Sequence, residues 1–553
     1  MTRHPVVPPA EIDDPGAHQG AREGARRLDA PLRGSALLLL GRFLAIGGGL
    51  LVQVLIVRHL SQTAYGDFAY ALAVVNVLTV VVGLGLEQAV QRFAAIYDEQ
   101  GRRELIAGAL VLQVMVVLVL GTLVVVVVAT TQSFLVDTSG ASPQAVHLLA
   151  VLAVLAPLMS LDGMVTGLFA VYARPTAIFW RRYVLAPGLK VAVAVWVVVT
   201  GAGVHGLAWG YVAATVVGLA MYAVVLRRIL VERGVLGRGQ PIVLPTRELL
   251  GFTARAVTAD LVVIVLWASD VIIVGWWGGS DDVALLQAVQ PLANGNLLVF
   301  YAMIPLFIPE AARLFTRGDG PGVTRLLRRG SLWIVLFTFP AVALTTSLAE
   351  PLTPLLFGPE YADSAPVLAA MAVGTYVLAA FGLTGLTLKA VGELRVLAWS
   401  NVGVVLLNVP VNIALVVRLG PVGVAVGTAG ALAVLSALKC WAVYRATGAH
   451  VLDRAILRSL LQVTLSLVAL HVLVWRFHAS LAAAMAVTVV LWCLLLHANR
   501  AALQVDAVFP ELRRSRVMGL LLVAPRRPVL PDDQAEPVAI DDLEDRCSPP
   551  SPR

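Results

Sequence analysis

The stretch that decides the fold class reads LIAGALVLQVMVVLVLGTLVVVVVA and covers residues 105–129. It contains no charged residue and includes five consecutive valines, Val124 to Val128. An apolar segment of about 18 or more residues can cross the roughly 30 Å hydrocarbon core of a bilayer as a helix. Apolar segments of this length recur along the chain, which predicts a polytopic membrane protein.

The composition agrees with that class. Of the 553 residues, 59% are hydrophobic and only 14% are charged, whereas about 25% of residues are charged in a soluble globular protein. The net charge of +7 does not indicate nucleic-acid binding, because the basic residues recur at one end of each pair of apolar segments and form no single patch. Residues 1–33 are polar and contain no apolar stretch before a small-residue cleavage site, so they do not read as a signal peptide.

The apolar segments predict an all-α fold of about fourteen transmembrane helices. Their ranges are 35–57, 68–91, 105–130, 146–171, 183–200, 206–226, 252–276, 284–308, 329–349, 365–388, 396–417, 421–444, 456–475 and 480–499. The links after even-numbered helices contain twenty arginines and the links after odd-numbered helices contain three. Basic residues collect in cytoplasmic loops, so we expect both termini in the cytoplasm.

A weak internal repeat, at an offset of about 218 residues, predicts two lobes. Asn76 corresponds to Asn294 in this repeat, and Arg42 to Asp260. Two six-helix lobes would be parallel repeats, related by a pseudo-twofold axis along the membrane normal, with the substrate site between them. The expected organisation is a cytoplasmic polar tail (1–34), an N-lobe (35–226), a cytoplasmic linker (227–251), a C-lobe (252–445), two further helices (456–499) and a disordered cytoplasmic tail (500–553).

Several classes of enzyme are disfavoured. A phosphate-binding loop needs lysine followed by serine or threonine, but Val191, Ala390 and Cys440 follow the three lysines. The chain has no HExxH motif and no cysteine pair at metal-ligand spacing. The outer links are too short to hold an acceptor sugar for a polymerase. We therefore expect a protein that is not an enzyme and that needs no cofactor or metal.

Ionisable residues inside spans are costly and are functional candidates. Asp260 lies near mid-depth in the seventh predicted helix, and Asp270 lies in the outer third of the same helix. Arg42 lies about seven residues into the first helix, and Asp162 lies in the fourth. A polar cavity would explain these positions. Hydrogen bonds between packed helices, and snorkelling of Arg42 to the headgroups, are the alternatives.

Polar residues at helical spacing extend the candidate cavity. Gln53 follows Arg42 by eleven residues and shares its helix face. Asn76 and Glu87 repeat this spacing in the second predicted helix, and Asn294 occupies the repeat position of Asn76. Such stripes are expected where helices line water, and interhelical hydrogen bonds remain the alternative.

A series of short motifs, in order along residues 35–445, then resembles a known family. These motifs are Arg58-His59-Leu60-Ser61, Tyr65-Gly66-Asp67-Phe68-Ala69, Gly83-Leu84-Gly85-Leu86-Glu87-Gln88-Ala89, Ala268-Ser269-Asp270, Leu356-Phe357-Gly358-Pro359-Glu360-Tyr361, Ala390-Val391-Gly392-Glu393 and Gly420-Pro421-Val422-Gly423. Together they look like the bacterial polysaccharide exporters of the Wzx type. That family belongs to the multidrug/oligosaccharidyl-lipid/polysaccharide exporter superfamily, which also contains drug/cation antiporters and lipid II flippases.

The resemblance implies two six-helix bundles with two extra helices, in the bacterial plasma membrane. It also implies export of an undecaprenyl-pyrophosphate-linked oligosaccharide by alternating access, with coupling to an ion gradient (H⁺ or Na⁺) or to the membrane potential. The few cations expected in the cavity, with Arg42 foremost, and the two acids of the seventh helix depart from a strongly cationic site. A drug/cation antiporter of the same fold is the alternative function, followed by a membrane polysaccharide polymerase or ligase.

Overall fold

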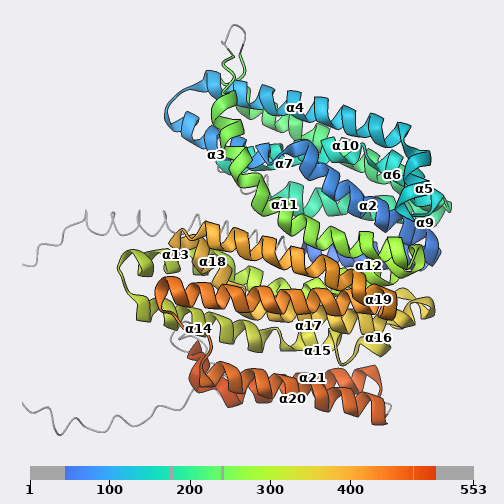
Figure 1. The fold of residues 1–553 in the computed structure, drawn as a ribbon, viewed down its shortest axis with the longest axis vertical. Coiled ribbons are helices and arrows are strands. Elements are labelled where there is room, and N and C mark those ends of the chain that lie inside the picture. The colour runs from blue at the N-terminus through green and yellow to red at the C-terminus, as the bar shows by residue number, and fades with distance from the viewer. Residues whose placement is uncertain (1–40, 42–43, 173–178, 238–241, 478, 506–553) are drawn as a thin grey trace, which may run out of the picture. The chain divides into compact units, whose positions relative to one another are not determined.

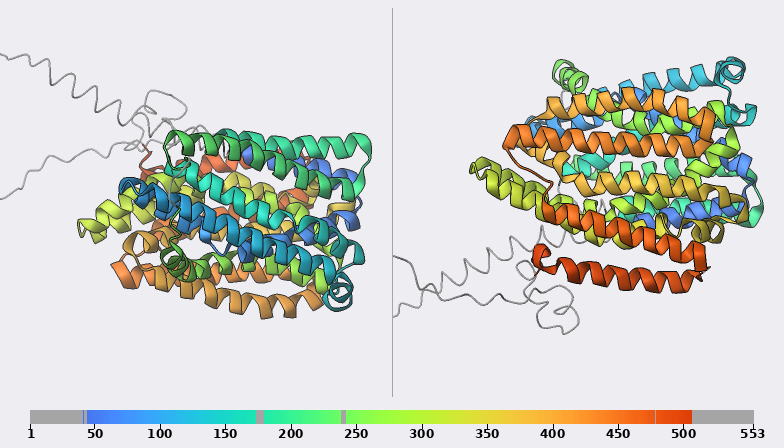
Figure 2. Two further views of the ribbon diagram at one scale, coloured as in Figure 1. Left: turned by 90° about the horizontal axis from the view of Figure 1, so that it is seen from above. Right: turned by 60° about the horizontal axis from the view of Figure 1, so that its bottom comes forward.

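The computed structural model describes residues 41, 44–172, 179–237, 242–477 and 479–505. Every regular element in these ranges is a helix, and the described residues contain no strand. The axes of the long helices of residues 44–495 lie roughly parallel to one another (Figure 1 and Figure 2). This arrangement fits a membrane protein, because a helix satisfies all its backbone hydrogen bonds within its own segment. The predicted all-α, multi-pass fold is confirmed.

The N-terminal half contains the helix Leu44–His59 and the helices up to residue 232. Their bounds are α2 (Gln62–Gly83), α3 (Leu86–Glu99), α4 (Arg103–Thr130), α5 (Gln132–Ser139), α6 (Pro143–Leu152), α7 (Leu155–Val171), the π-helix η1 (Trp180–Leu185), α9 (Ala186–Thr200) and α10 (Gly203–Glu232).

The C-terminal half begins with a long helix and ends with a pair. Its elements are α11 (Thr246–Trp277), α12 (Ser280–Asn294), η2 (Gly295–Leu297), α13 (Leu298–Thr316), α14 (Gly320–Phe337), α15 (Phe339–Thr345), α16 (Ala349–Phe357), η3 (Pro359–Ser364), α17 (Ala365–Phe381), α18 (Leu383–Val391), α19 (Leu394–Thr447), α20 (Arg454–Phe477) and α21 (Leu481–Leu503).

The number of spans differs from the sequence expectation. Ten helices of the described residues are long and apolar enough to cross a membrane, and the bent pair α14 and α15 would make eleven. Leu44–His59 is a shorter apolar helix, and α19 by itself contains the predicted spans 396–417 and 421–444. The count of fourteen, the pseudo-twofold axis and the domain boundaries stay predictions.

Gly420 divides α19 into two segments. Its φ of +57° is left-handed, a conformation that glycine adopts without the steric cost of a Cβ atom. Asn412 Nδ2 donates to Thr428 Oγ1 at 3.0 Å, and these two residues lie eight positions before and after Gly420. The two segments of α19 therefore lie side by side and run in opposite directions.

The predicted span 68–91 is wrong in its bounds, because it ends early in the structure. Leu84 (φ 49°) and Gly85 (φ 71°) are both left-handed, so α2 stops at Gly83 and α3 starts at Leu86. The helix also starts earlier than predicted, at Gln62, because Ser61 caps α2 by accepting a hydrogen bond from the Ala64 backbone N–H. The predicted span 284–308 is similarly interrupted by the 3₁₀ turn η2.

The two ends of the helices differ in charge. Many arginines flank the links at residues 100–102, 317–319, 392–393 and 448–453, and we call this the arginine-rich end. The links at residues 60–61, 131, 201–202 and 278–279 mark the opposite, arginine-poor end. Near that end α2 crosses α12 closely, because a Cβ atom on Gly66 would lie 1.8 Å from the carbonyl oxygen of Ser280. Only glycine permits this approach.

Candidate functional site

A cavity of about 800 Å³, here called the central cavity, lies between helices of the two halves. Its wall is formed by Leu44–His59, α2, α3, α7 and α10 from the N-terminal half, and by α11, α12 and α18 from the C-terminal half. Its principal polar and aromatic residues are Gln53, Tyr65, Asn76, Glu87, Gln88, Tyr211, Trp267, Gln287, Gln290 and Lys389. The structure thus brings together three residues that the sequence proposed, namely Gln53, Asn76 and Glu87.

The lining changes character along the helices. Glu87, in the first turn of α3, and Lys389, in the last turn of α18, place charge toward the arginine-rich end. Toward the other end, Gln53 Nε2 donates to Tyr65 Oη at 2.5 Å and to the Gln287 carbonyl oxygen at 3.1 Å. That end of the cavity is lined by amides and aromatic rings among the described residues.

Hydrogen bonds join the two halves at the arginine-poor end, and we call this set the outer seam. The buried Asp67 carboxylate accepts from Ser280 Oγ of α12 and from Ser142 Oγ, both at 2.5 Å. Thr63 Oγ1 donates to Asp281 Oδ1 at 2.6 Å. Arg58 donates to the carbonyl oxygens of Leu355 and Leu356 in α16. These contacts hold α2 and the end of helix Leu44–His59 against α12 and α16 at this end.

A second polar site is buried within the C-terminal half. Asp270 of α11 is 2% exposed and accepts from Asn412 Nδ2 and Thr428 Oγ1, each at 2.9 Å, and from Asn408 Nδ2 at 3.4 Å. The three partners are themselves buried and belong to α19. We call these four residues the Asp270 cluster. No salt bridge to Asp270 occurs among the described residues, so amide and hydroxyl groups surround this carboxylate.

The chemistry of the Asp270 cluster suits a small hard cation. Carboxylate, amide and hydroxyl oxygens are ligands of such cations, and Asn412 Oδ1 is buried without a hydrogen-bond partner. A half-turn of that amide would present its oxygen to the carboxylate, an arrangement that a bound cation stabilises. A proton on Asp270 could serve the same purpose. The described residues contain no group of three or more His, Cys, Asp or Glu side chains that could hold a metal.

Asp162 lies apart from both sites. It forms an ion pair with Arg181 of η1, and Arg181 Nη1 also donates to Thr166 Oγ1 at 2.8 Å. The Arg181 guanidinium stands 5.0 Å from the centre of the Tyr222 ring. This arrangement joins α7, η1 and α10 within the N-terminal half, so it favours the structural interpretation of Asp162.

The remaining candidate residues from the sequence are Asn294, Arg42 and Asp260. Asn294 is exposed at the end of α12 and does not line the central cavity, whereas the nearby Asn296 is buried and donates to Thr345 Oγ1 at 3.2 Å. The repeat position that Asn294 shares with Asn76 therefore does not bring it to the central cavity. Arg42 and the side chain of Asp260 lie outside the described residues.

Sequence reasoning missed several residues of both sites. Lys389, Gln287 and Gln290 line the central cavity, but a single amide or an end-of-helix lysine carries no distinctive signal. Two partners of Asp270 could be recognised in the sequence. Asn408 and Asn412 are four residues apart and share a helix face inside an apolar span.

Comparison with known proteins gives the family. The sequence matches the family described as polysaccharide biosynthesis protein over residues 32–312, which is more than half of the chain. The chain belongs to this polysaccharide biosynthesis protein family. No curated protein sequence matches it.

Solved structures share the fold of this family member. The lipid II flippase MurJ in an inward closed conformation aligns with a TM-score of 0.64 at 12% identity, covering 86% of this chain and 98% of MurJ. An inward-facing multidrug resistance MATE family transporter of the MOP superfamily aligns with a TM-score of 0.59 at 16% identity, covering 72% and 94%. A MOP superfamily transporter from Pyrococcus furiosus aligns with a TM-score of 0.52 at 16% identity, covering 75% and 95%. At these identities the likeness shows the fold alone.

Proposed function

We propose that this protein translocates a lipid-linked oligosaccharide, carried on undecaprenyl pyrophosphate, across the bacterial plasma membrane for polysaccharide or cell-wall polymer assembly. The central cavity is the observation that carries the proposal. It lies between the two halves, with the outer seam at the arginine-poor end and with Glu87 and Lys389 on the side of the arginine-rich end. A cavity of about 800 Å³ lies within the range of small-molecule sites, roughly 300–1,000 Å³.

The lining matches the two parts of such a headgroup. Lys389 supplies a cation for a pyrophosphate, because charge-assisted hydrogen bonds to phosphate are stronger than neutral ones. Gln53, Gln287 and Gln290 offer amide donors and acceptors to sugar hydroxyls. Tyr65, Tyr211 and Trp267 offer rings on which the C–H faces of sugars pack. The polyprenyl chain stays in the lipid, so only the polar headgroup passes through the protein.

Transport proceeds by alternating access between the two halves. If both termini lie in the cytoplasm, as the arginine bias predicts, the outer seam lies on the outer side of the membrane, and Glu87 and Lys389 lie on the cytoplasmic side of the central cavity. Opening the outer seam and closing the arginine-rich end would release the headgroup at the outer leaflet. No covalent bond forms or breaks in this cycle, so the protein is not an enzyme.

The Asp270 cluster is the proposed site of the coupling ion, H⁺ or Na⁺. A ligand shifts a conformational equilibrium only by its difference in affinity for the two states. The cluster joins α11 to both segments of α19, so a cation bound there stabilises the state in which these helices are packed together. Release of the ion would free α11 to move.

A drug/cation antiporter of the same fold is the second candidate function. Glu87 and the aromatic residues Tyr65, Tyr211 and Trp267 of the central cavity could bind an organic cation through charge and cation–π contacts. Solved MATE transporters share the fold, and that likeness does not separate the two functions.

Deletion of the gene in its native bacterium distinguishes the two. A flippase mutant loses the surface polymer and accumulates the lipid-linked intermediate on the cytoplasmic leaflet, and a plasmid copy of the wild-type gene restores export. An antiporter mutant would keep the polymer and become sensitive to cationic dyes. Normal lipid-linked intermediates in the deletion strain would contradict the proposed function.

A labelling experiment tests the proposed orientation. In a background without native cysteines, Thr138→Cys and Glu360→Cys at the exposed arginine-poor end should react with an impermeant thiol reagent in intact cells. Gln100→Cys and Arg317→Cys at the exposed arginine-rich end should react only after the cells are opened. The reverse pattern would show that the termini lie outside.

A further inference from the structure

A second cavity, of about 390 Å³, lies in the C-terminal half and shares no lining residue with the central cavity. Its wall comes from Phe381 of α17, from the second segment of α19, and from the link at residues 448–453. On the α19 side the wall is formed largely by the small residues Ala433, Ala437 and Cys440, so it is nearly apolar. We call this the lateral pocket. It has the chemistry of a site for a hydrocarbon chain.

The lateral pocket lies at the depth of a membrane interface. It is built from the last turns of α19 and the following link, which belong to the arginine-rich end. Trp441 and Tyr444 line it and remain 56% and 47% exposed. Tryptophan and tyrosine concentrate where the hydrocarbon meets the headgroups, because their rings are apolar with one polar atom. The pocket is therefore placed to meet the chain and the headgroup of one lipid.

Two arginines contact residues that line the pocket. The Arg445 guanidinium stands 5.6 Å from the centre of the Trp441 ring, and no salt bridge to Arg445 occurs among the described residues. Arg328 Nε donates to the carbonyl oxygen of His450 at 2.8 Å, and the His450 ring lies 4.3 Å from that of Tyr444. Positive charge beside an apolar pocket at the interface is the pattern of anionic-lipid recognition.

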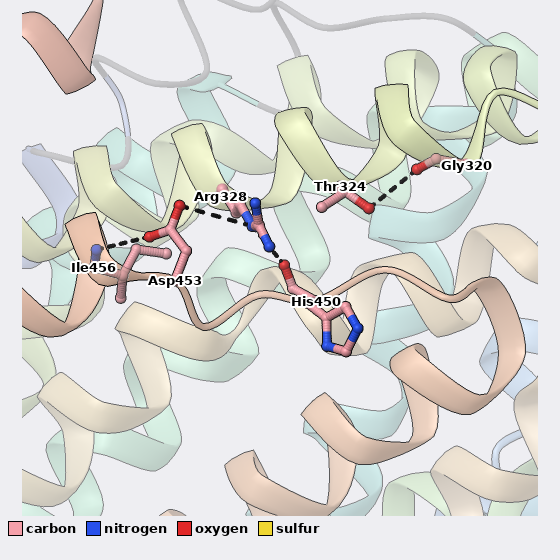
Figure 3. Close-up of polar contacts among 6 residues, drawn as sticks. All are labelled: Gly320, Thr324, Arg328, His450, Asp453 and Ile456. Carbon is pink, nitrogen blue, oxygen red and sulfur yellow. Dashed lines mark hydrogen bonds and ion pairs between the residues drawn. The ribbon is translucent and has the colours of Figure 1, made fainter.

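A polar network fixes the link that forms one wall of the pocket (Figure 3). Arg328 of α14 lies 3.8 Å from Asp453 Oδ2, while Asp453 Oδ1 accepts from the Ile456 backbone N–H at the start of α20 at 2.9 Å. Arg328 thus contacts the link at both His450 and Asp453. Its charge is balanced by Asp453, which leaves Arg445 as the group placed to bind an anion.

We propose that the lateral pocket binds an anionic phospholipid of the leaflet at the arginine-rich end, with one acyl chain in the pocket and the phosphate at Arg445. Phosphatidylglycerol represents this class. A zwitterionic lipid of the same chain length would fill the same apolar volume but gain less from Arg445, so the preference for the anionic headgroup is the distinguishing property. This site is independent of the proposed transport function.

Quenching of Trp441 by brominated phospholipids tests the proposal on the full-length protein in bilayers. The fluorescence contribution of Trp441 is obtained by subtracting the signal of Trp441→Phe. Brominated phosphatidylglycerol should quench it at an about fivefold lower mole fraction than brominated phosphatidylcholine, the fold-change expected for one basic residue near an anionic lipid. Arg445→Gln should remove this preference, and Ala437→Phe, which fills the pocket, should weaken quenching by both lipids.

The matched control is Arg418→Gln, which removes an exposed arginine of α19 two residues before Gly420, at the arginine-poor end. It should leave the preference unchanged. Equal quenching by the two lipids in the wild-type protein would overturn the proposal, as would a preference that survives Arg445→Gln. Displacement of brominated phosphatidylglycerol by undecaprenyl phosphate at lower concentration than by unlabelled phosphatidylglycerol would also overturn it, because the pocket would then hold a polyprenyl chain.

Discussion

The central cavity and the Asp270 cluster differ in size and in exposure, although they share α11. Trp267, Ala268 and Val271 of α11 face the cavity of about 800 Å³, whereas Asp270 faces α19 and is buried. Successive residues of a helix are about 100° apart, so these neighbours point to different sides. One face of α11 therefore lines the central cavity, and another face carries the buried carboxylate of the Asp270 cluster.

This difference teaches how one helix connects two binding events. In the proposed mechanism, a cation at Asp270 changes how tightly α11 packs on α19, and the same helix forms part of the cavity wall. Coupling between the sites then needs no chain of intermediate residues. Asp270→Asn changes the Asp270 cluster, Lys389→Gln and Gln290→Ala change the central cavity, and Gly66→Ala changes the outer seam.

The largest effect is expected for Asp270→Asn. The amide has the same size but removes the carboxylate, the one charged group of the Asp270 cluster. Loss of a buried charged partner costs several kcal/mol, so gradient-driven transport should fall by about 100-fold or more. Transport in proteoliposomes, with and without a Na⁺ or H⁺ gradient, measures the effect.

Asp162→Asn is the matched control, since it breaks the ion pair with Arg181 away from both sites. It should lower the thermal unfolding temperature and keep the response to the gradient. Normal gradient-driven transport by Asp270→Asn would show that the cluster only packs α11 against α19.

The next effect is expected for Lys389→Gln. In the proposed binding mode, removing the lysine of the central cavity deletes a charge-assisted hydrogen bond to the pyrophosphate, worth about 1.5–3 kcal/mol. Affinity for the lipid-linked substrate should fall by roughly 10- to 100-fold, as measured by binding of a fluorescent substrate. Lys439→Gln changes a lysine that does not line the cavity and should bind normally. Equal effects of the two changes would remove Lys389 from the substrate site.

A smaller, conformational effect is expected for Gly66→Ala. The added methyl group would lie 1.8 Å from the Ser280 carbonyl oxygen, so α2 and α12 must separate at the outer seam. Labelling of Gln287→Cys by an impermeant thiol reagent from the arginine-poor side should rise several-fold in correctly inserted protein. Gly430→Ala, where the methyl group meets open space, should not change labelling. Unchanged labelling in Gly66→Ala would place the closure elsewhere.

The smallest effect is expected for Gln290→Ala. One neutral hydrogen bond to a sugar hydroxyl contributes about 0.5–1.5 kcal/mol, so substrate affinity should fall by roughly 2- to 10-fold. Gln132→Ala changes a glutamine outside the cavity and should have no effect on binding. If both variants bind substrate as the wild type does, the sugar does not contact this part of the wall.

The sequence supports much of the fold and part of the site. Apolar length locates most of the long helices, and the polar positions Gln53, Asn76 and Glu87 reach the central cavity because a polar residue in an apolar span must face protein or water. The break at Leu84 escaped prediction, since a leucine in a left-handed conformation is held by tertiary packing and not by its own preference.

The Asp270 cluster shows a second limit of prediction from a single sequence. Asp270 stands out as an acid in an apolar span, but its partners Asn412 and Thr428 lie 142 and 158 residues further along the chain. A single sequence carries no record of which helices pack together. The interpretation of Asp162 as a cavity residue met the same limit, because nothing in its local sequence points to the ion pair with Arg181.

The most direct test of the account is a sided transport assay with the purified protein. Proteoliposomes carry a fluorescent undecaprenyl-pyrophosphate-linked oligosaccharide, and a membrane-impermeant quencher reports the fraction exposed at the outer face over time. With a Na⁺ or H⁺ gradient imposed, we expect the wild-type protein to change the exposed fraction faster than empty liposomes, and Asp270→Asn to bind the substrate without responding to either gradient. Rates equal to empty liposomes, or an Asp270→Asn protein as responsive as the wild type, would contradict it.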